Sequence, residues 1–101
     1  METSHECVIM NSAIEGLGVF PKTVIPKGTK IGVVLHVSFL WINISRFGEF
    51  INHSDEPTAV LQYIDGKHIA VSVIEIHPDV EITLNYDELP WYCDGNKKHF
   101  K

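Results

Sequence analysis

Three adjacent polar side chains, Asn52, His53 and Ser54, directly follow an apolar pair in the stretch FINHSDEP, which runs from Phe50 to Pro57. The apolar pair predicts the end of a buried segment, so the polar groups after it need hydrogen-bond partners. Asn and Ser favour turns, where they bond to nearby backbone groups, and a proline fixes the exit of the chain. The other interpretation is a polar site at the end of a core strand. The stretch by itself leaves both open.

Two further stretches carry residues with chemical potential. In EGLGVF, Gly16 and Gly18 lie on either side of Leu17. Two positions without a Cβ let a backbone approach a ligand closely, although a tight turn is the simpler interpretation of the pair. In EITLNYDE, an apolar alternating segment ends at Tyr86. Tyrosine is common in strands, so a core position is open for it beside a role in a site.

The histidines and cysteines form no metal-binding pattern. The six histidines are scattered at positions 5, 36, 53, 68, 77 and 99, and the two cysteines, Cys7 and Cys93, lie near opposite ends. Neither set has the spacing of a zinc site or of a disulfide framework. The N-terminus lacks a signal-peptide pattern, and no apolar run would span a bilayer. We expect no metal, no membrane contact, two thiols in a reducing compartment and an intracellular protein of the cytoplasm or nucleus.

Length and composition predict one globular domain. The chain has 101 residues, of which 45% are hydrophobic and 21% charged. This length is enough for one domain and not two. The net charge of −5 argues against a general nucleic-acid binder, which needs a basic surface. An acidic surface suits a basic partner, such as a peptide rich in Lys and Arg.

The elements that must position these residues are short strands. Valine and isoleucine, interrupted often by glycine and proline, predict a mostly-β domain with little helix. Strands are expected at residues 7–10, 19–20 and 29–37, with a last alternating strand at 82–86. Pro26 and Gly28 predict a turn before the longest strand, because proline fixes a negative φ and glycine permits a positive one.

A hairpin is the clearest local prediction. Strands at 58–63 and 68–74 flank the dipeptide Asp65-Gly66, which favours the tight turn of a β-hairpin. The segment 38–50 stays open. A short helix would fit it, but Gly48 and the β-branched residues argue against one.

Taken in order, EGLGVF with IPKG after it, FINHSDEP, EITLNYDE and an aromatic tail resemble the SET domain, the fold of many protein lysine methyltransferases. The resemblance implies a β-clip fold of short strands and small sheets with a C-terminal pseudoknot. Residues 1–101 would be a single SET domain, with its core at about 8–91 and a tail at 92–101. The short insert at 38–49 and the absence of cysteine-rich flanks resemble the minimal SET proteins of viruses and phages. This resemblance implies that the protein could act inside a virus-infected host cell.

The resemblance implies S-adenosylmethionine as the cofactor and S-adenosylhomocysteine as the product. The backbone of Gly16–Gly18 would contact the methionine portion of the cofactor. Asn52, at the pseudoknot, would hold its amino-acid end, and His53 would meet the adenine largely through backbone groups. Trp91 would pack on the adenine and wall the lysine channel, since its large aromatic face suits that contact. A C-terminal anchor of the core is a compatible role for it.

Tyr86 matches the tyrosine that serves catalysis in the family. Methyl transfer to lysine needs a neutral amine, and a free lysine with a pKa of about 10.4 is neutral in only ~1 of 2,500 molecules at pH 7. A narrow apolar channel lowers that pKa because it penalises the ammonium. The remaining work is alignment and exclusion of water rather than general-base chemistry. A phenol hydroxyl at the inner end of the channel can orient the amine.

Two departures from the family pattern are visible. Thr58 stands where the family usually has Asn, and the strand at 31–37 lacks the tyrosine that many members use in the lysine channel. Phe39, Trp41 or Phe47 would have to line that wall, and the sequence does not choose among them.

The sequence therefore predicts a methyltransferase that acts on lysine in a basic protein, histone or other, with a homodimer expected because so small a domain has little surface for a complete peptide groove. A SET or β-clip module that binds without catalysis is the alternative.

Overall fold

The computed structural model describes residues 6–38 and 42–88. Phe39, Trp41 and Trp91 lie outside the described residues, so their expected roles stay predictions. The strands are β1 (Cys7–Asn11), β2 (Leu17–Pro21), β3 (Lys30–Val37), β4 (Ile42–Ile44), β5 (Asn52–His53), β6 (Ala59–Ile64), β7 (Lys67–Ser72) and β8 (Thr83–Leu84). The helical elements are α1 (Arg46–Glu49) and a 3-10 helix, η1 (Tyr86–Glu88). The predicted mostly-β class, with short strands and little helix, is confirmed.

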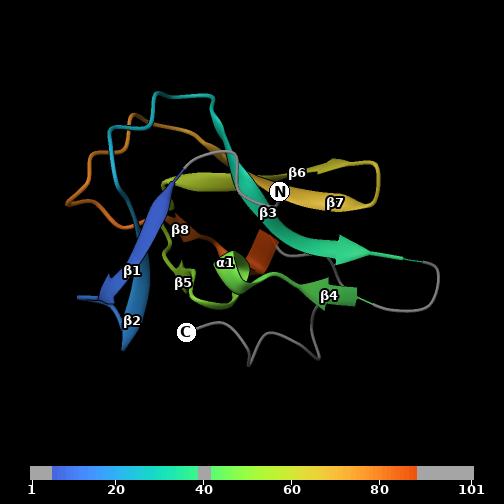
Figure 1. Cartoon of the computed structure of the whole chain (residues 1–101), viewed down its shortest axis with the longest axis horizontal. Helices are drawn as coiled ribbons and strands as arrows, with labels where there is room; N and C mark the ends of the chain where they lie inside the picture. Colours follow the sequence, from blue (N-terminus) through green and yellow to red (C-terminus); the bar gives the residue numbers. More distant parts are fainter. Residues whose placement is uncertain (1–5, 39–41, 89–101) are drawn as a thin grey trace.

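Three small sheets make up the described part of the chain (Figure 1). β1 and β2 form an antiparallel pair, and β4-β3-β7-β6 form a four-stranded sheet. β5 and β8 pair in parallel, with Asn52 opposite Thr83 and His53 opposite Leu84. A single bridge between Val19 and Ile82 ties the first pair to the last. No described helix is long and apolar enough to cross a membrane.

The β6–β7 hairpin confirms the local prediction. Its strands pair from Ala59 opposite Ser72 to Ile64 opposite Lys67, so only Asp65 and Gly66 remain in the loop. Both loop residues have positive φ, 49° and 79°, as the favoured two-residue hairpin turns require. The expected turn after Pro26 is also present, with Gly28 at a φ of 83°.

The open segment 38–50 contains β4 and then α1. Ser45 caps the helix, since its Oγ accepts from the Gly48 backbone N–H at 2.9 Å and donates to the Val33 carbonyl at 2.5 Å. Gly48, which argued against a helix by propensity, is needed for packing. A Cβ there would overlap the Val34 carbonyl of β3. Glycine has a low helix propensity, and the close packing of α1 against β3 that Gly48 permits offsets this cost.

The last strand is shorter than predicted. The alternation suggested a strand over 82–86, but only Thr83 and Leu84 are in β8, and Tyr86 begins η1. Side-chain acceptors end the ladder here. The backbone N–H of Tyr86 donates to His53 Nδ1 at 3.0 Å, and that of Asp87 donates to Asn85 Oδ1 at 2.9 Å. Such local acceptors compete with strand pairing.

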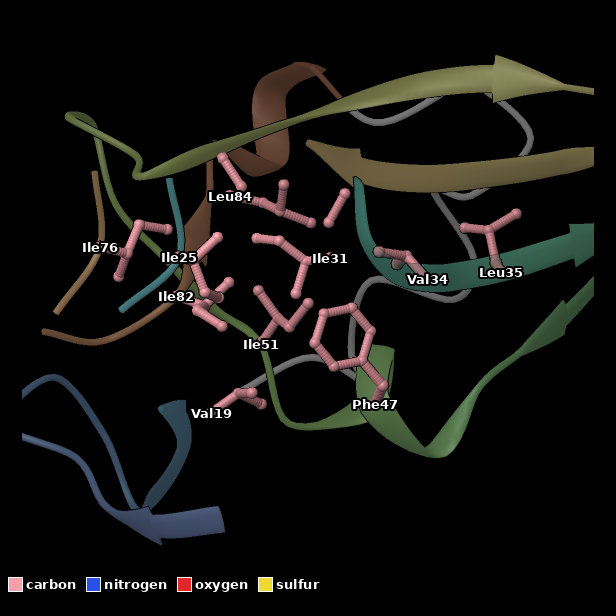
Figure 2. Close-up of a cluster of buried hydrophobic side chains, with 12 residues drawn as sticks. Val19, Ile25, Ile31, Val34, Leu35, Phe47, Ile51, Ile76, Ile82 and Leu84 are labelled. Atoms are coloured by element: carbon pink, nitrogen blue, oxygen red, sulfur yellow. The ribbon is translucent and has the colours of Figure 1, made fainter. Parts of the chain in front are cut away.

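The hydrophobic core joins the three sheets. Figure 2 shows buried isoleucine, valine and leucine side chains converging from β2, β3, β8 and the loops between them. Ile25, Ile51 and Ile82 are fully buried in this cluster. Phe47 from α1 points into the same cluster. The Phe47 ring is therefore part of the core. This packing explains the aromatic residue at position 47, so a role in lining a substrate channel is not needed to account for it.

Candidate functional site

Asn52 is the centre of the most polar buried region that the structure describes. Its side chain is fully buried, with 0% of its surface exposed. Four acceptors lie within hydrogen-bond distance of the amide nitrogen, Nδ2: Ser12 Oγ at 3.0 Å, the Glu15 carbonyl at 3.2 Å, the Leu17 carbonyl at 3.1 Å and Glu81 Oε2 at 2.6 Å. One side chain from β5 thus holds the whole β1–β2 loop against the segment before β8.

Glu81 and Ser12 complete this cluster, and the sequence predicted a role for neither. Ser12 Oγ donates to Glu81 Oε1 at 2.6 Å. The same oxygen accepts from the backbone N–H groups of Ile14 at 2.9 Å and Glu15 at 3.3 Å, which orders the loop. Glu81 belongs to the EITLNYDE stretch, so a signal for it existed. For Ser12 there was none beyond its nearness to the glycines.

The two glycines of the loop serve different purposes. Gly16 has a φ of 48° and no atom near the position that a Cβ would take. It is a turn glycine, as the simpler interpretation held. Gly18 has the Glu81 carboxylate in the space of a Cβ. The missing side chain at Gly18 therefore makes room for a carboxylate of the same chain, a reason that differs from the expected approach to a ligand. Leu17 contributes its carbonyl to Asn52.

Tyr86 and His53 form the second half of the site. The Tyr86 hydroxyl donates to the Ile51 carbonyl at 2.7 Å, one residue before Asn52. The rings of Tyr86 and His53 meet edge to face, with their centroids 5.1 Å apart. Since His53 Nδ1 accepts from the Tyr86 backbone N–H, the ring proton lies on Nε2, which is 3.0 Å from Asp55 Oδ1. The imidazole thus has a fixed orientation and holds the start of η1.

The surroundings of Tyr86 keep its phenol protonated. Burial raises the pKa of Tyr86 above its ordinary value of 10.0, and the negative charges of Glu15 and Glu81 raise that pKa further. At neutral pH the hydroxyl is a donor to the Ile51 carbonyl and is not a base. This state suits a group that orients a substrate rather than one that removes a proton.

Thr58, the first departure from the family pattern, is well integrated. Its Oγ1 donates to the Glu81 carbonyl at 3.1 Å and accepts from the Thr83 backbone N–H at 2.9 Å. Its own backbone N–H donates to Thr83 Oγ1 at 3.1 Å. The threonine therefore supplies a complete hydrogen-bond network between the stretch after β5 and β8. It also holds the backbone of Glu81.

The described site residues converge from three stretches distant in sequence. Gly16–Gly18 reaches Asn52 through the Leu17 carbonyl, and Tyr86 reaches His53 of the same strand and the Ile51 carbonyl just before it. The parallel pairing of β5 and β8 brings the second and third stretches side by side (Figure 1). This is the meeting of segments expected at a SET pseudoknot.

Comparison with known proteins places this architecture. The structure is similar to the crystal structure of a "putative histone methyltransferase" from Plasmodium falciparum, with a TM-score of 0.69 and 25% sequence identity over 88% of this chain and 98% of that chain. The chain has a SET-like fold. Neither the models of known protein families nor the sequences of curated proteins give a match. The resemblance to viral and phage proteins stays a prediction.

Proposed function

We propose that this SET-like chain is an S-adenosylmethionine-dependent methyltransferase that modifies lysine in a basic protein segment. The observation that carries the proposal is the convergence of the glycine loop and Tyr86 on the short stretch Ile51–His53, which includes the buried Asn52 amide. In the sequence, more than 30 residues separate each of these stretches from the next. The likeness to a protein described as a "putative histone methyltransferase" supports the same reaction class.

The site has unmatched acceptors that fit the amino-acid end of the cofactor. Asn52 Oδ1 is buried and has no hydrogen-bond partner among the described residues. A buried polar atom without a partner is costly, so an unmatched one points to a missing donor. Four acceptors face Nδ2, which has only two protons,. A protonated α-amine, with three donors and a positive charge, matches both features.

The residues that would hold the cofactor follow from this match. Asn52 and the carbonyls of Glu15 and Leu17 would bind the amino-acid end, and the backbone at His53 would bind the adenine, with Trp91 packing on it. When bound, the cofactor supplies a methyl group on a sulfonium, the leaving group of an in-line displacement. The chain supplies position and a dry environment.

Tyr86 orients the acceptor amine. Its hydroxyl is fixed by the Ile51 carbonyl, and a phenol oxygen can accept as well as donate a hydrogen bond. It would therefore accept from a lysine amine and direct the nitrogen lone pair toward the methyl group. Because burial and the charges of Glu15 and Glu81 raise the pKa of Tyr86 above its ordinary value, the phenol stays protonated at neutral pH and can take this orienting role.

An acidic rim around the site favours a basic substrate. The rim consists of the exposed residues Glu15, Asp55, Glu56, Asp87 and Glu88. The stretches that form the site, 12–18, 51–58 and 81–88, contain no Lys or Arg. Opposite charge on a peptide would be attracted to this rim, which increases the rate of encounter.

The test is methyl transfer from labelled S-adenosylmethionine to lysine-rich proteins, histones among them. Tyr86→Phe is the matched variant, because it keeps the ring and removes only the hydroxyl. We expect transfer by the wild type and a loss of roughly 100-fold or more in the variant, the usual effect of removing one positioned polar group from an active site. Equal transfer by both proteins would contradict the role of Tyr86.

Calorimetry separates this proposal from a binding module without catalysis. The methyltransferase should bind S-adenosylhomocysteine, and Asn52→Ala should weaken that binding. A module that keeps only the fold should bind no cofactor, or should bind it equally well after Asn52→Ala.

A further inference from the structure

The carboxylate of Glu81 is engaged on both of its oxygens by residues far away in sequence. Oε1 accepts from Ser12 Oγ and Oε2 accepts from Asn52 Nδ2, each at 2.6 Å. The carboxylate also lies over Gly18, where no Cβ blocks it. Short bonds to a charged acceptor are stronger than neutral ones. Glu81 is therefore the strongest partner of the Asn52 amide.

This contact, together with the Glu15 and Leu17 carbonyls on the same side, fixes which way the Asn52 amide faces. The oxygen and nitrogen ends of an Asn side chain have nearly the same shape, so only hydrogen bonding distinguishes them. A carboxylate accepts and cannot donate, so it repels Oδ1 and binds Nδ2. With Nδ2 held by Glu81, Oδ1 is left on the other side of the amide, buried and without a partner among the described residues.

The charge of Glu81 also reaches the catalytic half of the site. Its negative charge contributes to the raised pKa of Tyr86. No Lys or Arg within the stretches 12–18, 51–58 and 81–88 offsets that charge. The polar cluster around Asn52 therefore carries negative charge as well as several hydrogen-bond acceptors. A ligand group that enters it should be a cation with hydrogen-bond donors.

We propose that Glu81, assisted by Ser12, is a positioning residue that fixes the Asn52 amide with Oδ1 toward the ligand and selects ligands with a protonated primary amine. The inference rests on the proposed function, because the amine in question is that of the cofactor's amino-acid end. Glu81 acts through Asn52 and through its charge, without itself transferring a group. Ser12 holds the second oxygen of the carboxylate, so its loss should weaken the same selection.

The test compares two ligands that share the adenosine and thioether but differ in the amine. S-adenosylhomocysteine carries the amino-acid end, and 5′-methylthioadenosine lacks it. Calorimetry gives the affinity of each for the wild type, Glu81→Gln, Ser12→Ala and the control Glu75→Gln. Glu75 is exposed and lies outside the site, where it pairs with His77 at 3.0 Å. Its substitution removes the same charge.

We expect Glu81→Gln to weaken S-adenosylhomocysteine binding by roughly 10- to 100-fold, the range for loss of a hydrogen bond to a charged group, and to leave 5′-methylthioadenosine binding unchanged. Ser12→Ala should change the ratio of the two affinities in the same direction by a few-fold. Glu75→Gln should leave both affinities as they are. This pattern would support selection by the amine.

Three results would overturn the inference. If Glu81→Gln weakens both ligands equally, or neither, Glu81 supports the fold without selecting the amine. If Glu81→Gln does not fold, Ser12→Ala decides, and an unchanged ratio of affinities in that variant is a negative result. If the wild type binds neither ligand, the proposed function itself fails, and the inference fails with it. That last outcome is distinct from the first two because it is visible before any substitution.

Discussion

The β6–β7 hairpin and the cluster around Asn52 are built in opposite ways. In the hairpin, Ile64 pairs with Lys67 and Ala59 with Ser72, so every partner is near in sequence. In the cluster, the bond from Asn52 to Glu81 spans 29 residues and that from Ser12 to Glu81 spans 69. The hairpin is a local structure with a turn sequence, whereas the cluster exists only when the whole domain has folded.

The difference teaches which part of the molecule tolerates change. A local turn can be weakened without disturbing distant segments, because β7 also pairs with β3, and both hairpin strands contribute to the core through Ala59 and Ala70. In the polar cluster, the side chains depend on one another. Each of its members is the partner of another, so the loss of one leaves a buried polar group unmatched. Substitutions should therefore cost more in the cluster than in the hairpin.

The largest effect is expected from Asn52→Ala. The substitution leaves the Glu81 carboxylate and the Glu15 and Leu17 carbonyls without their shared donor. We expect the free energy of unfolding to fall by about 3 kcal/mol, the usual cost of leaving buried polar and charged groups unpaired. Urea denaturation measures this. Asn43→Ala is the matched control, since Asn43 is exposed on β4, and it should stay within about 0.5 kcal/mol of the wild type. Equal losses in both variants would contradict the claim that the buried hydrogen bonds of Asn52 stabilise the fold.

A smaller effect should separate the two glycines of the β1–β2 loop. In Gly18→Ala the new Cβ overlaps the Glu81 carboxylate. The carboxylate, which binds Asn52 Nδ2, must then shift, and we expect the free energy of unfolding to fall by about 2 kcal/mol,. Gly16→Ala meets no neighbour, and only its φ of 48° is unfavourable for alanine. That costs about 1 kcal/mol. Thermal or urea unfolding of both variants checks the order, and a larger loss for Gly16→Ala would contradict the packing role of Gly18.

The contrast between the regions also explains what the sequence could predict. The Asp65-Gly66 turn and the strands beside it follow from residues that act on their neighbours. The convergence of Gly16–Gly18, Asn52 and Tyr86 was predicted from a family resemblance, since composition and spacing alone left turn and core interpretations open. The chemistry of the cluster was not predicted. Glu81 fills the space beside Gly18 only because a long-range fold brings it there.

One wrong prediction and one that stayed open are explained in the same way. The alternation in 82–86 predicts a strand, but His53 Nδ1 and Asn85 Oδ1 bind the backbone N–H groups that would have continued it. Gly48 disfavours a helix by propensity, yet the helix forms because Ser45 caps it and β3 needs a close neighbour. In both cases a side chain or a surface from elsewhere in the chain outweighs the local preference.

The smallest expected effect is on the dependence of stability on pH, where the two regions should respond at opposite ends. Tyr86, in the site, has a pKa raised above 10.0 by burial and by Glu15 and Glu81, so its contribution is complete below pH 10 and is lost as the pH rises through the folded-state value,. His68, in the hairpin, has a pKa lowered from 6.5 by burial, so its contribution to stability is present above pH 6.5 and is lost as the pH falls,.

The melting temperature should therefore decline at both alkaline and mildly acidic pH. Tyr86→Phe should flatten only the alkaline decline and His68→Gln only the decline between about pH 7.5 and 5.5, a window set by the ordinary histidine pKa. If Tyr86→Phe left the alkaline decline unchanged, the phenol would not be the half-buried, protonated donor that links η1 to Ile51. The site would then lose the feature that separates it most clearly from the hairpin.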